Sequence, residues 1–275
     1  MAKPRVTLAT PVSVPDLLAL AERMADESGK LLRRRFRAEL AFEDKADKTP
    51  VTETDREVEK LLRAEIESAF PDHGIVGEEY ASVRENADYV WVLDPIDGTA
   101  GFVTGKPLFG TLIGCVHNGA PVIGVIDHPA LQERWTGGSG APTLFNGKRV
   151  RTRPCARISE AMLYATTPHM FVGGDSYAFD ALCEAVKRPQ YGADCYAYGL
   201  LASGYVDLVV EASMKPSDYC ALAPVVIAAG GIMTDWEGQP LGLKSDGRVI
   251  AAGDARIHAR ALKILATGRE LEQGG

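Results

Sequence analysis

The chain has 275 residues, of which 46% are hydrophobic and 24% are charged, and its formal net charge is −7. This length and composition suit one large or two moderate globular domains. The acidic balance argues against general nucleic-acid binding, which needs a basic surface, and no apolar run approaches the roughly 18–20 residues that span a bilayer.

The first 80 residues predict two helices and a short strand. Apolar side chains recur at helical spacing over residues 15–37, and the arginines of the last turn are expected to be solvated cations at a helix C-terminus. A polar loop is expected over residues 38–50. Thr52 then opens a second helix that runs to about Phe70. Residues 75–77 read as a strand that leads into the acidic pair Glu78 and Glu79.

The stretch from Trp91 to Thr99 is the most informative part of the chain. Residues 89–93 are aromatic and aliphatic, which predicts a buried strand with Trp91 in the core. Pro95 has no N–H for a sheet ladder, so the strand is predicted to stop near Asp94. Asp94 and Asp97 can then converge at the sheet edge.

Gly98 and Thr99 follow this acidic pair, and their backbone N–H groups could hold a phosphate at the start of a helix. Two carboxylates beside an anion-binding turn are typical of metal-assisted phosphate chemistry. The alternative is a tight turn whose aspartates merely cap the next helix.

The remaining elements mix helices and strands without strict alternation. Strands are expected over 108–116 and 121–126, joined by a hairpin turn at 117–120, and a further turn over 142–153. From about residue 158 the pattern predicts helices and strands at 177–187, 196–203, 206–210, 218–229, 232–234 and 254–266. This order favours a layered α/β or α+β fold over a barrel.

Five acidic residues stand next to predicted element boundaries, where their side chains can meet in one cleft: Asp55, Glu78, Asp94, Asp97 and Asp218. Burying several carboxylates together is very unfavourable unless cations neutralise them. Mg²⁺ prefers such oxygen ligands and keeps positions for water and phosphate. The five residues therefore predict a magnesium site that handles a phosphorylated small molecule.

The sequence resembles the inositol monophosphatase-like, lithium-sensitive phosphatase superfamily. The matching stretches are residues 50–55, 77–79, 91–99, and Asp218 followed by a helix that ends in a Gly-Gly pair. The resemblance implies a five-layer αβαβα sandwich of the inositol monophosphatase and fructose-1,6-bisphosphatase type, with an N-terminal half over residues 1–157 and a C-terminal half over 158–275. It also implies a homodimer.

The same resemblance implies roles for individual residues. Two to three Mg²⁺ ions would be held by Glu78, Asp94, the carbonyl of Ile96, Asp97 and Asp218. Asp97, Gly98 and Thr99 would hold the phosphate. Asp55 would orient Thr99, and Glu78 and Thr99 would position the attacking water. At Ser217 the chain departs from the family, which usually has an aromatic residue there; this predicts a looser third metal position.

Within that superfamily the chain looks closest to the histidinol-phosphatase branch, through residues 102–112, 163–171, 191–204 and 234–236. The implied substrate, L-histidinol phosphate, carries an ammonium and an imidazole, so acidic groups are expected near the cleft. Asp194 and Glu211 are the candidates; the alternatives are a helix N-cap for Asp194 and a solvated strand end for Glu211. Rival functions are hydrolysis of inositol monophosphate or another sugar phosphate, and regulatory binding on the same scaffold.

The other reactive residue types predict no further site. His73, His117, His128 and His169 fall in predicted turns, and Lys106 is expected to be a surface charge. The five cysteines lack C-x-x-C spacing, which favours free thiols in a reducing cytoplasm. Cys195 and Cys220 are expected to be small buried residues and not nucleophiles, because no histidine is recognisably paired with them.

Overall fold

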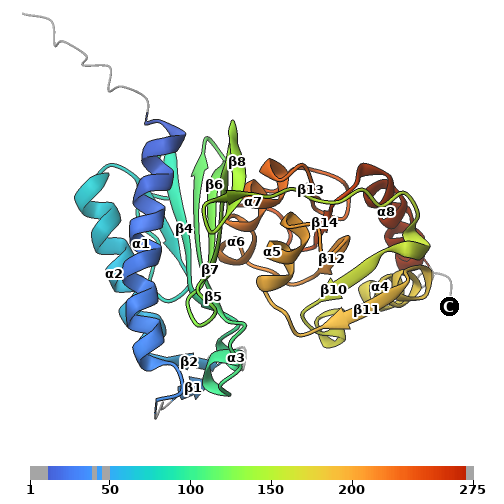
Figure 1. Ribbon diagram of the computed structural model, residues 1–275, viewed down its shortest axis with the longest axis horizontal. Helices are drawn as coiled ribbons and strands as arrows, with labels where there is room; N and C mark the ends of the chain where they lie inside the picture. Colours follow the sequence, from blue (N-terminus) through green and yellow to red (C-terminus); the bar gives the residue numbers. More distant parts are fainter. Residues whose placement is uncertain (1–11, 39–41, 45–49, 271–275) are drawn as a thin grey trace, which may run out of the picture.

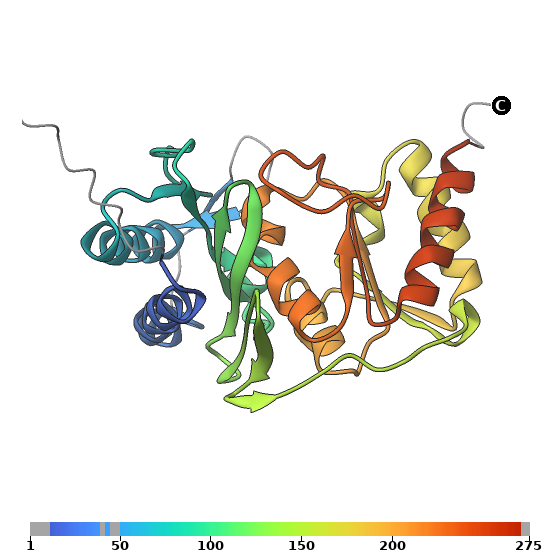
Figure 2. The same cartoon turned by 90° about the horizontal axis from the view of Figure 1, so that it is seen from above.

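The computed structural model describes residues 12–38, 42–44 and 50–270. Its elements stack in five layers, which are a helix pair, a seven-stranded sheet, a group of short helices, a five-stranded sheet and a second helix pair (Figure 1). The view from above shows the same succession (Figure 2). The expected five-layer αβαβα sandwich is confirmed. Among the described residues, no helix is long and apolar enough to cross a membrane.

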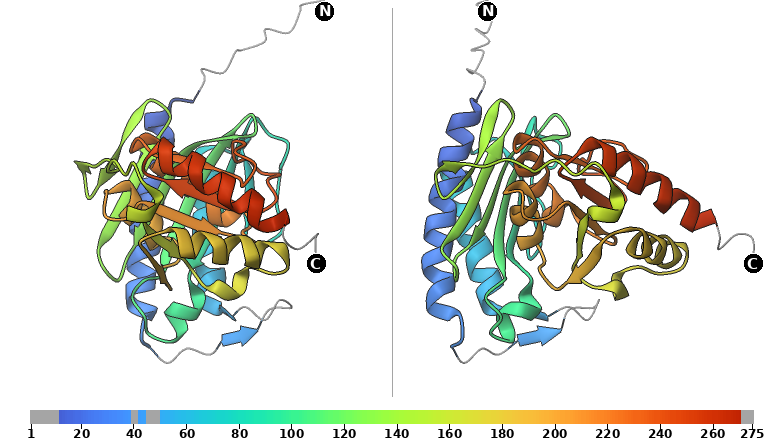
Figure 3. Two further views of the ribbon diagram at one scale, coloured as in Figure 1. Left: turned by 90° about the vertical axis from the view of Figure 1, so that its right-hand side faces the viewer. Right: turned by 45° about the vertical axis from the view of Figure 1, so that its right-hand side comes forward.

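The first layer holds α1 (Val14–Arg35) and α2 (Glu53–Ala69), and both begin at a side-chain cap. The Ser13 hydroxyl accepts the Asp16 N–H, and Thr52 and Asp55 form a reciprocal capping box. Both helices lay an apolar stripe on the seven-stranded sheet, with α1 running along its outer face (Figure 3). The boundaries predicted for these helices hold to within two residues.

The seven-stranded sheet has the order β3-β4-β5-β6-β7-β8-β9. Only β3 and β4 pair in parallel; each later strand runs antiparallel to its neighbour. The strands are β3 (Gly74–Gly77), β4 (Tyr89–Asp97), β5 (Gly110–His117), β6 (Ala120–His128), β7 (Glu133–Gly138), β8 (Ala141–Phe145) and β9 (Lys148–Arg149). Trp91 on β4 is fully buried, as predicted.

The end of β4 differs from the prediction, because the strand continues past Asp94 to Asp97. The register against β5 shifts between these two aspartates, so Pro95 lies in an irregular stretch where its missing N–H breaks no regular ladder bond. After Asp97 the chain turns at Gly98 into the short helix α3 (Thr99–Val103), and Gly98 has a left-handed φ of 77° that suits glycine.

The five-stranded sheet has the order β11-β10-β12-β14-β13 and mixes parallel with antiparallel pairs. Its strands are β10 (Met162–Ala165), β11 (Arg188–Tyr191), β12 (Leu208–Glu211), β13 (Ile232–Thr234) and β14 (Val249–Ala252). The middle layer consists of α5 (Tyr196–Ala202), α6 (Pro216–Tyr219) and α7 (Leu222–Ala228). The last layer consists of α4 (Gly174–Ala185) and α8 (Ala255–Glu270).

Several elements were missed or joined wrongly from sequence. The strands β7, β10, β11 and β14 were not predicted, and the turn expected over 142–153 contains most of β8 and all of β9. The single helix expected over 218–229 is two short helices, α6 and α7, with Cys220 and Ala221 between them. Pro224 explains the break, because a proline cannot donate a hydrogen bond to the carbonyl four residues earlier and its ring crowds that carbonyl.

The loop expected over residues 38–50 lies partly outside the described residues. Its described part includes β1 (Phe42–Asp44), which pairs antiparallel with β2 (Pro50–Thr52). The two large sheets are joined by the segment between β9 and β10, which contains residues 157 and 158. The division into halves at that point stays a prediction.

The prediction of solvated turn histidines was wrong for His73 and His128. His73 is buried, stacks on Phe70 and Tyr89, and accepts a hydrogen bond from the Trp91 indole at 3.1 Å. His128 ends β6 and is fully buried. His117 is half-buried at the β5–β6 hairpin, and His169 is exposed in a short 3₁₀ turn over Pro168–Met170.

Two glycines that face each other on β5 and β6 bring the middle layer onto the sheet. Gly114 and Gly124 are directly paired, and both lie against the backbone that joins α6 to α7. A Cβ on Gly124 would come within 1.8 Å of the Ala221 carbonyl oxygen. Any side chain there would push the α6–α7 junction away from the sheet, and Asp218 with it.

We therefore expect Gly124→Ala to lower the free energy of unfolding by about 1–3 kcal/mol, the usual range for overpacking a close-packed interior. Urea denaturation followed by circular dichroism measures this. Gly101→Ala in α3 is the control, because its Cβ would meet nothing closer than 3.7 Å. Equal midpoints for Gly124→Ala and wild type would contradict the close approach.

Candidate active site

One cleft of about 300 Å³ gathers most of the acidic residues that the sequence singled out. Strand β4 contributes Asp94, Ile96 and Asp97, and the following turn contributes Gly98 and Thr99. Glu78 follows β3, and Asp218 comes from α6 in the middle layer. Ala100, Ser213 and Lys215 complete the lining. Residues from 78 to 218 thus meet where the two sheets approach each other.

Asp55 lies directly behind this lining and contacts Thr99. It is buried, and its Oδ2 accepts hydrogen bonds from the Thr52 N–H and hydroxyl at 2.7 and 2.6 Å. Its Oδ1 lies 3.4 Å from the Thr99 hydroxyl, which also donates to the Ile96 carbonyl at 2.8 Å. The capping box at the start of α2 therefore anchors a carboxylate that fixes the Thr99 side chain.

The carboxyl groups of the cleft repel one another strongly. Burial raises the pKa of Asp94 well above its usual range, and the charges of Glu78, Asp97, Asp218 and Asp55 raise it further. Burial and the nearby Asp194 raise the pKa of Asp97 in the same way. Burial raises the pKa of Asp218 to about 6. Positive charge in the cleft would favour the ionised carboxylates.

The donor set suits a hard cation such as Mg²⁺, because four carboxylates and one backbone carbonyl are all oxygen ligands. In the conformation described, however, no three of the described His, Cys, Asp or Glu residues form a group that could hold a metal ion. Hydrogen bonds take up several ligand oxygens instead: the Ile96 N–H donates to Asp94, and the Lys215 N–H and Ser217 hydroxyl donate to Asp218.

Lys215 was not predicted as a cleft residue. Its ammonium lies 3.4 Å from Glu78 Oε1, and its charge lowers the pKa of Asp218 against the effect of burial. The lysine thus supplies part of the positive charge that the cleft needs. The signal in the sequence is its position three residues before Asp218, at the cap of α6.

Glu59 is a second residue that sequence reasoning missed. It is fully buried on α2, and its carboxylate accepts the N–H groups of Glu79 and Tyr80 at 2.7 and 3.3 Å. A Cβ on Gly77 would come within 2.0 Å of the same carboxylate, so glycine is required there. Glu59 therefore fixes the turn that carries Glu78 to the cleft.

The two candidate substrate selectors lie beside the cleft lining and differ in their contacts. Asp194 does not cap α5 with its side chain: it lies against Gly98, 3.6 Å from the Lys106 ammonium. Lys106 also donates to the Gly192 carbonyl, so the prediction of a simple surface charge was wrong. Asp194 adds negative charge next to Asp97.

Glu211 is buried at the end of β12, so it is not a solvated strand end. Its two oxygens accept hydrogen bonds from the Thr166 N–H at 3.0 Å and the Tyr198 hydroxyl at 2.9 Å. Burial raises the pKa of Glu211 to about 7, and the charge of Asp194 contributes to the shift. The structure thus places a second acidic group behind Asp194.

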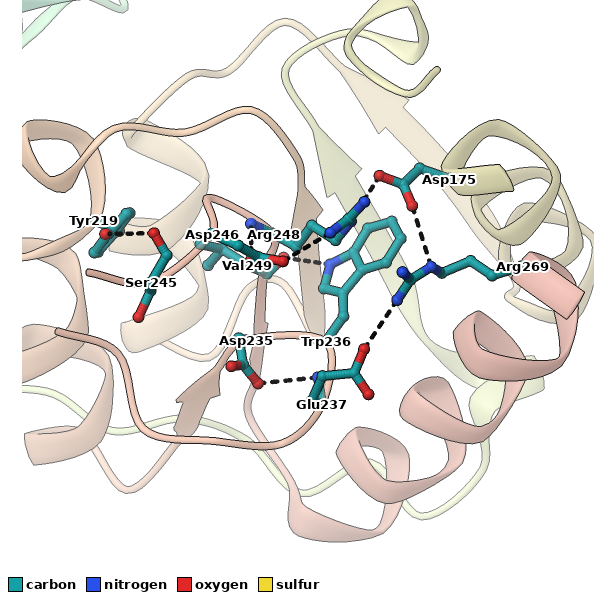
Figure 4. A network of polar contacts seen from close by, with 10 residues as sticks. All are labelled: Asp175, Tyr219, Asp235, Trp236, Glu237, Ser245, Asp246, Arg248, Val249 and Arg269. Atoms are coloured by element: carbon teal, nitrogen blue, oxygen red, sulfur yellow. Dashed lines mark hydrogen bonds and ion pairs between the residues drawn. The ribbon is translucent and has the colours of Figure 1, made fainter. Parts of the chain in front are cut away.

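A polar network connects the segment over residues 235–249 with α4 and α8 (Figure 4). The Tyr219 hydroxyl donates to the Ser245 carbonyl, and the nearby Arg248 pairs with both Asp246 and Asp175 at 2.7 Å. Arg269 near the end of α8 also pairs with Asp175, at 3.4 Å. The last helix is thereby connected to the segment that packs against α6.

Comparisons with known proteins agree with this geometry. Residues 14–270 match the inositol monophosphatase family. The chain is 44% identical over 277 residues to the bifunctional phosphatase IMPL2, chloroplastic, of Arabidopsis thaliana, and the match covers 96% of this chain and 80% of the plant protein. It is 36% identical over 239 residues to a histidinol-phosphatase of Chlorobaculum parvum, and the match covers 86% of this chain and 92% of the bacterial protein.

Among solved structures, an inositol monophosphatase from Zymomonas mobilis superposes with a TM-score of 0.86. The two chains are 44% identical, and the match covers 93% of this chain and 99% of the other. The resemblance noted from the motif at residues 91–99 is thus confirmed over nearly the whole chain. The chain belongs to the inositol monophosphatase family.

Proposed function

We propose that the chain is a Mg²⁺-dependent phosphomonoesterase that prefers L-histidinol phosphate. The observation that carries the proposal is the cleft at the end of β4, where four carboxylates adjoin the Gly98–Thr99 turn. A buried group of acids with mutually raised pKa values needs added cations. A phosphate ester needs cations as well, because its own oxygens are anionic.

The residues that would hold Mg²⁺ are Glu78, Asp94, the Ile96 carbonyl, Asp97 and Asp218, which supports two to three ions. When bound, Mg²⁺ supplies charge neutralisation for the phosphoryl oxygens and lowers the pKa of water. Lys215, whose ammonium lies 3.4 Å from Glu78 Oε1, would supply further positive charge in the same cleft.

The chain's own residues orient the reacting groups. The Thr99 hydroxyl donates to the Ile96 carbonyl or to Asp55, which leaves a lone pair of its oxygen to accept a hydrogen bond from the attacking water. Transfer of the water proton to Thr99 would be balanced by transfer of the Thr99 hydroxyl proton to Asp55. Glu78, fixed by the turn that Glu59 holds, is the second group positioned to accept that proton. The backbone N–H groups of Gly98 and Thr99 would hold the phosphate at the start of α3.

The choice of histidinol phosphate is supported by the charge beside the cleft and by the named relatives. Asp194 and Glu211 are both acidic groups near Asp97, and we expect the leaving alcohol to lie beside them. A cationic ammonium would be attracted there, whereas the hydroxyl groups of a neutral polyol would gain less. The 36% identical relative is a histidinol-phosphatase. Inositol monophosphate is the second candidate substrate, since the Zymomonas mobilis structure is an inositol monophosphatase. Homodimer formation and a cytoplasmic location stay predictions.

We expect Asp97→Asn to abolish phosphatase activity, because one ligand of the cation is lost. The fold should be retained, because the buried charge that is removed is repelled by its neighbours. Released phosphate and far-UV circular dichroism measure the two effects. Glu67→Gln, on the exposed face of α2, is the matched removal of a charge and should behave like wild type. If Asp97→Asn fails to fold, Asp97 has a structural role and the expectation is wrong.

A substrate panel tests the preference for histidinol phosphate. We expect histidinol phosphate to exceed inositol 1-phosphate by at least about tenfold in kcat/KM, which corresponds to about 1.4 kcal/mol. Asp194→Asn should raise KM for histidinol phosphate and leave KM for inositol phosphate nearly unchanged, because only the first substrate is a cation. A tenfold preference for inositol phosphate in the wild type would overturn the choice of substrate.

The raised carboxyl pKa values also predict how stability depends on pH without metal. Asp218 and Glu211, with pKa values of about 6 and 7, bind protons more tightly in the folded than in the unfolded chain. Stability is therefore greatest below their unfolded pKa values and falls as pH rises through about 7. We expect the melting temperature in EDTA to fall from pH 5.5 to pH 8. Mg²⁺ should raise it more at pH 8, where the carboxylates are ionised; no Mg²⁺ effect at either pH would contradict the metal site.

A further inference from the structure

A row of residues runs from the cleft into the sheet across three strands. Asp97 on β4 pairs with Gly110 on β5, and the next pair, Thr111 with Asp127, places Gly110 beside His128 at the end of β6. A Cβ on Gly110 would come 2.8 Å from Cys195 Sγ and 3.0 Å from the His128 ring. The missing side chain at Gly110 thus leaves room for the Cys195 thiol over the sheet.

Cys195 contacts the residues on both sides of that glycine. Its backbone N–H donates to Asp97 Oδ2 at 2.8 Å. Its thiol lies 3.5 Å from His128 Nε2. The thiol therefore does have a histidine partner, which the sequence did not reveal, because the two residues are 67 positions apart.

The tautomer of His128 follows from its other nitrogen. Nδ1 lies 2.9 Å from the Phe109 carbonyl oxygen, which can only accept, so Nδ1 carries the proton. Burial lowers the pKa of His128 to about 4, so the ring is neutral at neutral pH and Nε2 accepts a hydrogen bond. The rings of Tyr196 and Trp135 meet the imidazole edge to face and hold its plane.

Cys195 also fixes the turn that precedes α5. Asp194, its neighbour in the chain, has a left-handed φ of 50°, which is unusual for a residue with a side chain. A hydrogen bond connects Asp97 to the Cys195 backbone, and a peptide bond connects Asp194 to Cys195. One buried residue therefore sets the position of a metal-binding carboxylate and of the substrate-selecting carboxylate.

We propose that Cys195 and His128 are positioning residues that hold the Asp97 carboxylate and the Asp194 turn at the cleft. The inference rests on the proposed function, since it concerns the Mg²⁺ site and the substrate charge. His128 anchors the thiol through Nε2, and the thiol keeps the Cys195 N–H directed at Asp97. Two apolar side chains of the same volume would pack as well, but they would not fix the direction of the Cys195 N–H toward Asp97.

The test compares Mg²⁺ binding by calorimetry, without substrate, in variants matched in size. Cys195→Ala loses the thiol donor, and we expect its dissociation constant for Mg²⁺ to rise roughly tenfold, the lower end of the usual effect of removing a residue that orients a ligand. Cys195→Ser keeps a donor and should stay near wild type. His128→Asn keeps a donor for Phe109 but loses the acceptor for the thiol, so it should resemble Cys195→Ala. His128→Gln keeps that acceptor and should bind Mg²⁺ better than His128→Asn.

The steady-state constants supply the second measurement. Cys195→Ala should also raise KM for histidinol phosphate more than KM for inositol phosphate, because the Asp194 turn is loosened. The inference is wrong if Cys195→Ala and Cys195→Ser bind Mg²⁺ with the same dissociation constant. This holds whether both variants bind like wild type or both bind more weakly and melt at lower temperatures, because Cys195 and His128 would then only fill space. If wild type itself binds no Mg²⁺, the proposed function fails and the inference fails with it.

Discussion

Repulsion among buried carboxylates at the end of β4 is the constraint on which the rest of the site depends. Burial raises the pKa of Asp94 and of Asp97, and the charges of neighbouring acids raise both further. A fold can hold such a group only if rigid elements keep the side chains together against their repulsion. Four elements do so here, because β3, β4, α3 and α6 each deliver part of the lining. The positions of the carboxylates are thus set by the backbone framework.

Glycine contacts set the distances between these elements. Gly77 lets the Glu59 carboxylate reach the turn that carries Glu78, and Gly124 lets the α6–α7 junction rest on β6. Gly110 makes room for Cys195 beside Asp97. In each case a backbone without a side chain brings a neighbouring layer closer than a Cβ would allow. The site is therefore assembled by close packing between layers, and the polar groups are fixed by that packing.

The sequence was sufficient to predict the acidic residues of the cleft and the layered fold. It was not sufficient to predict the residues that hold those acids in place. Asp94, Asp97 and Asp218 could be predicted because each stands next to a local signal, a proline, a glycine or a helix start. Glu59 and His128 could not, because their roles depend on contacts across 20 and 67 positions that no local pattern encodes. Lys215 had a local signal in its position three residues before Asp218, but its contact with Glu78 spans 137 positions. The missed strands β10 and β14 are four residues each and apolar throughout, so they show no polar–apolar alternation, and such short apolar runs do not distinguish a strand from a helix. The break between α6 and α7 is predictable from Pro224, because a proline disturbs the helix about four residues before it.

Positive charge within the protein is distributed unequally over the cleft. Lys215 lies beside Glu78 and lowers the pKa of Asp218, whereas Asp94 is surrounded by four acids that all raise its pKa. The need for an added cation is therefore greatest at the end of β4. Asp94 and Asp97 belong to the seven-stranded sheet, and Asp218 belongs to the middle layer that the polar network of the C-terminal part supports. A cation shared between them would link the two layers as well as neutralise them, so binding and rigidity of the cleft would rise together.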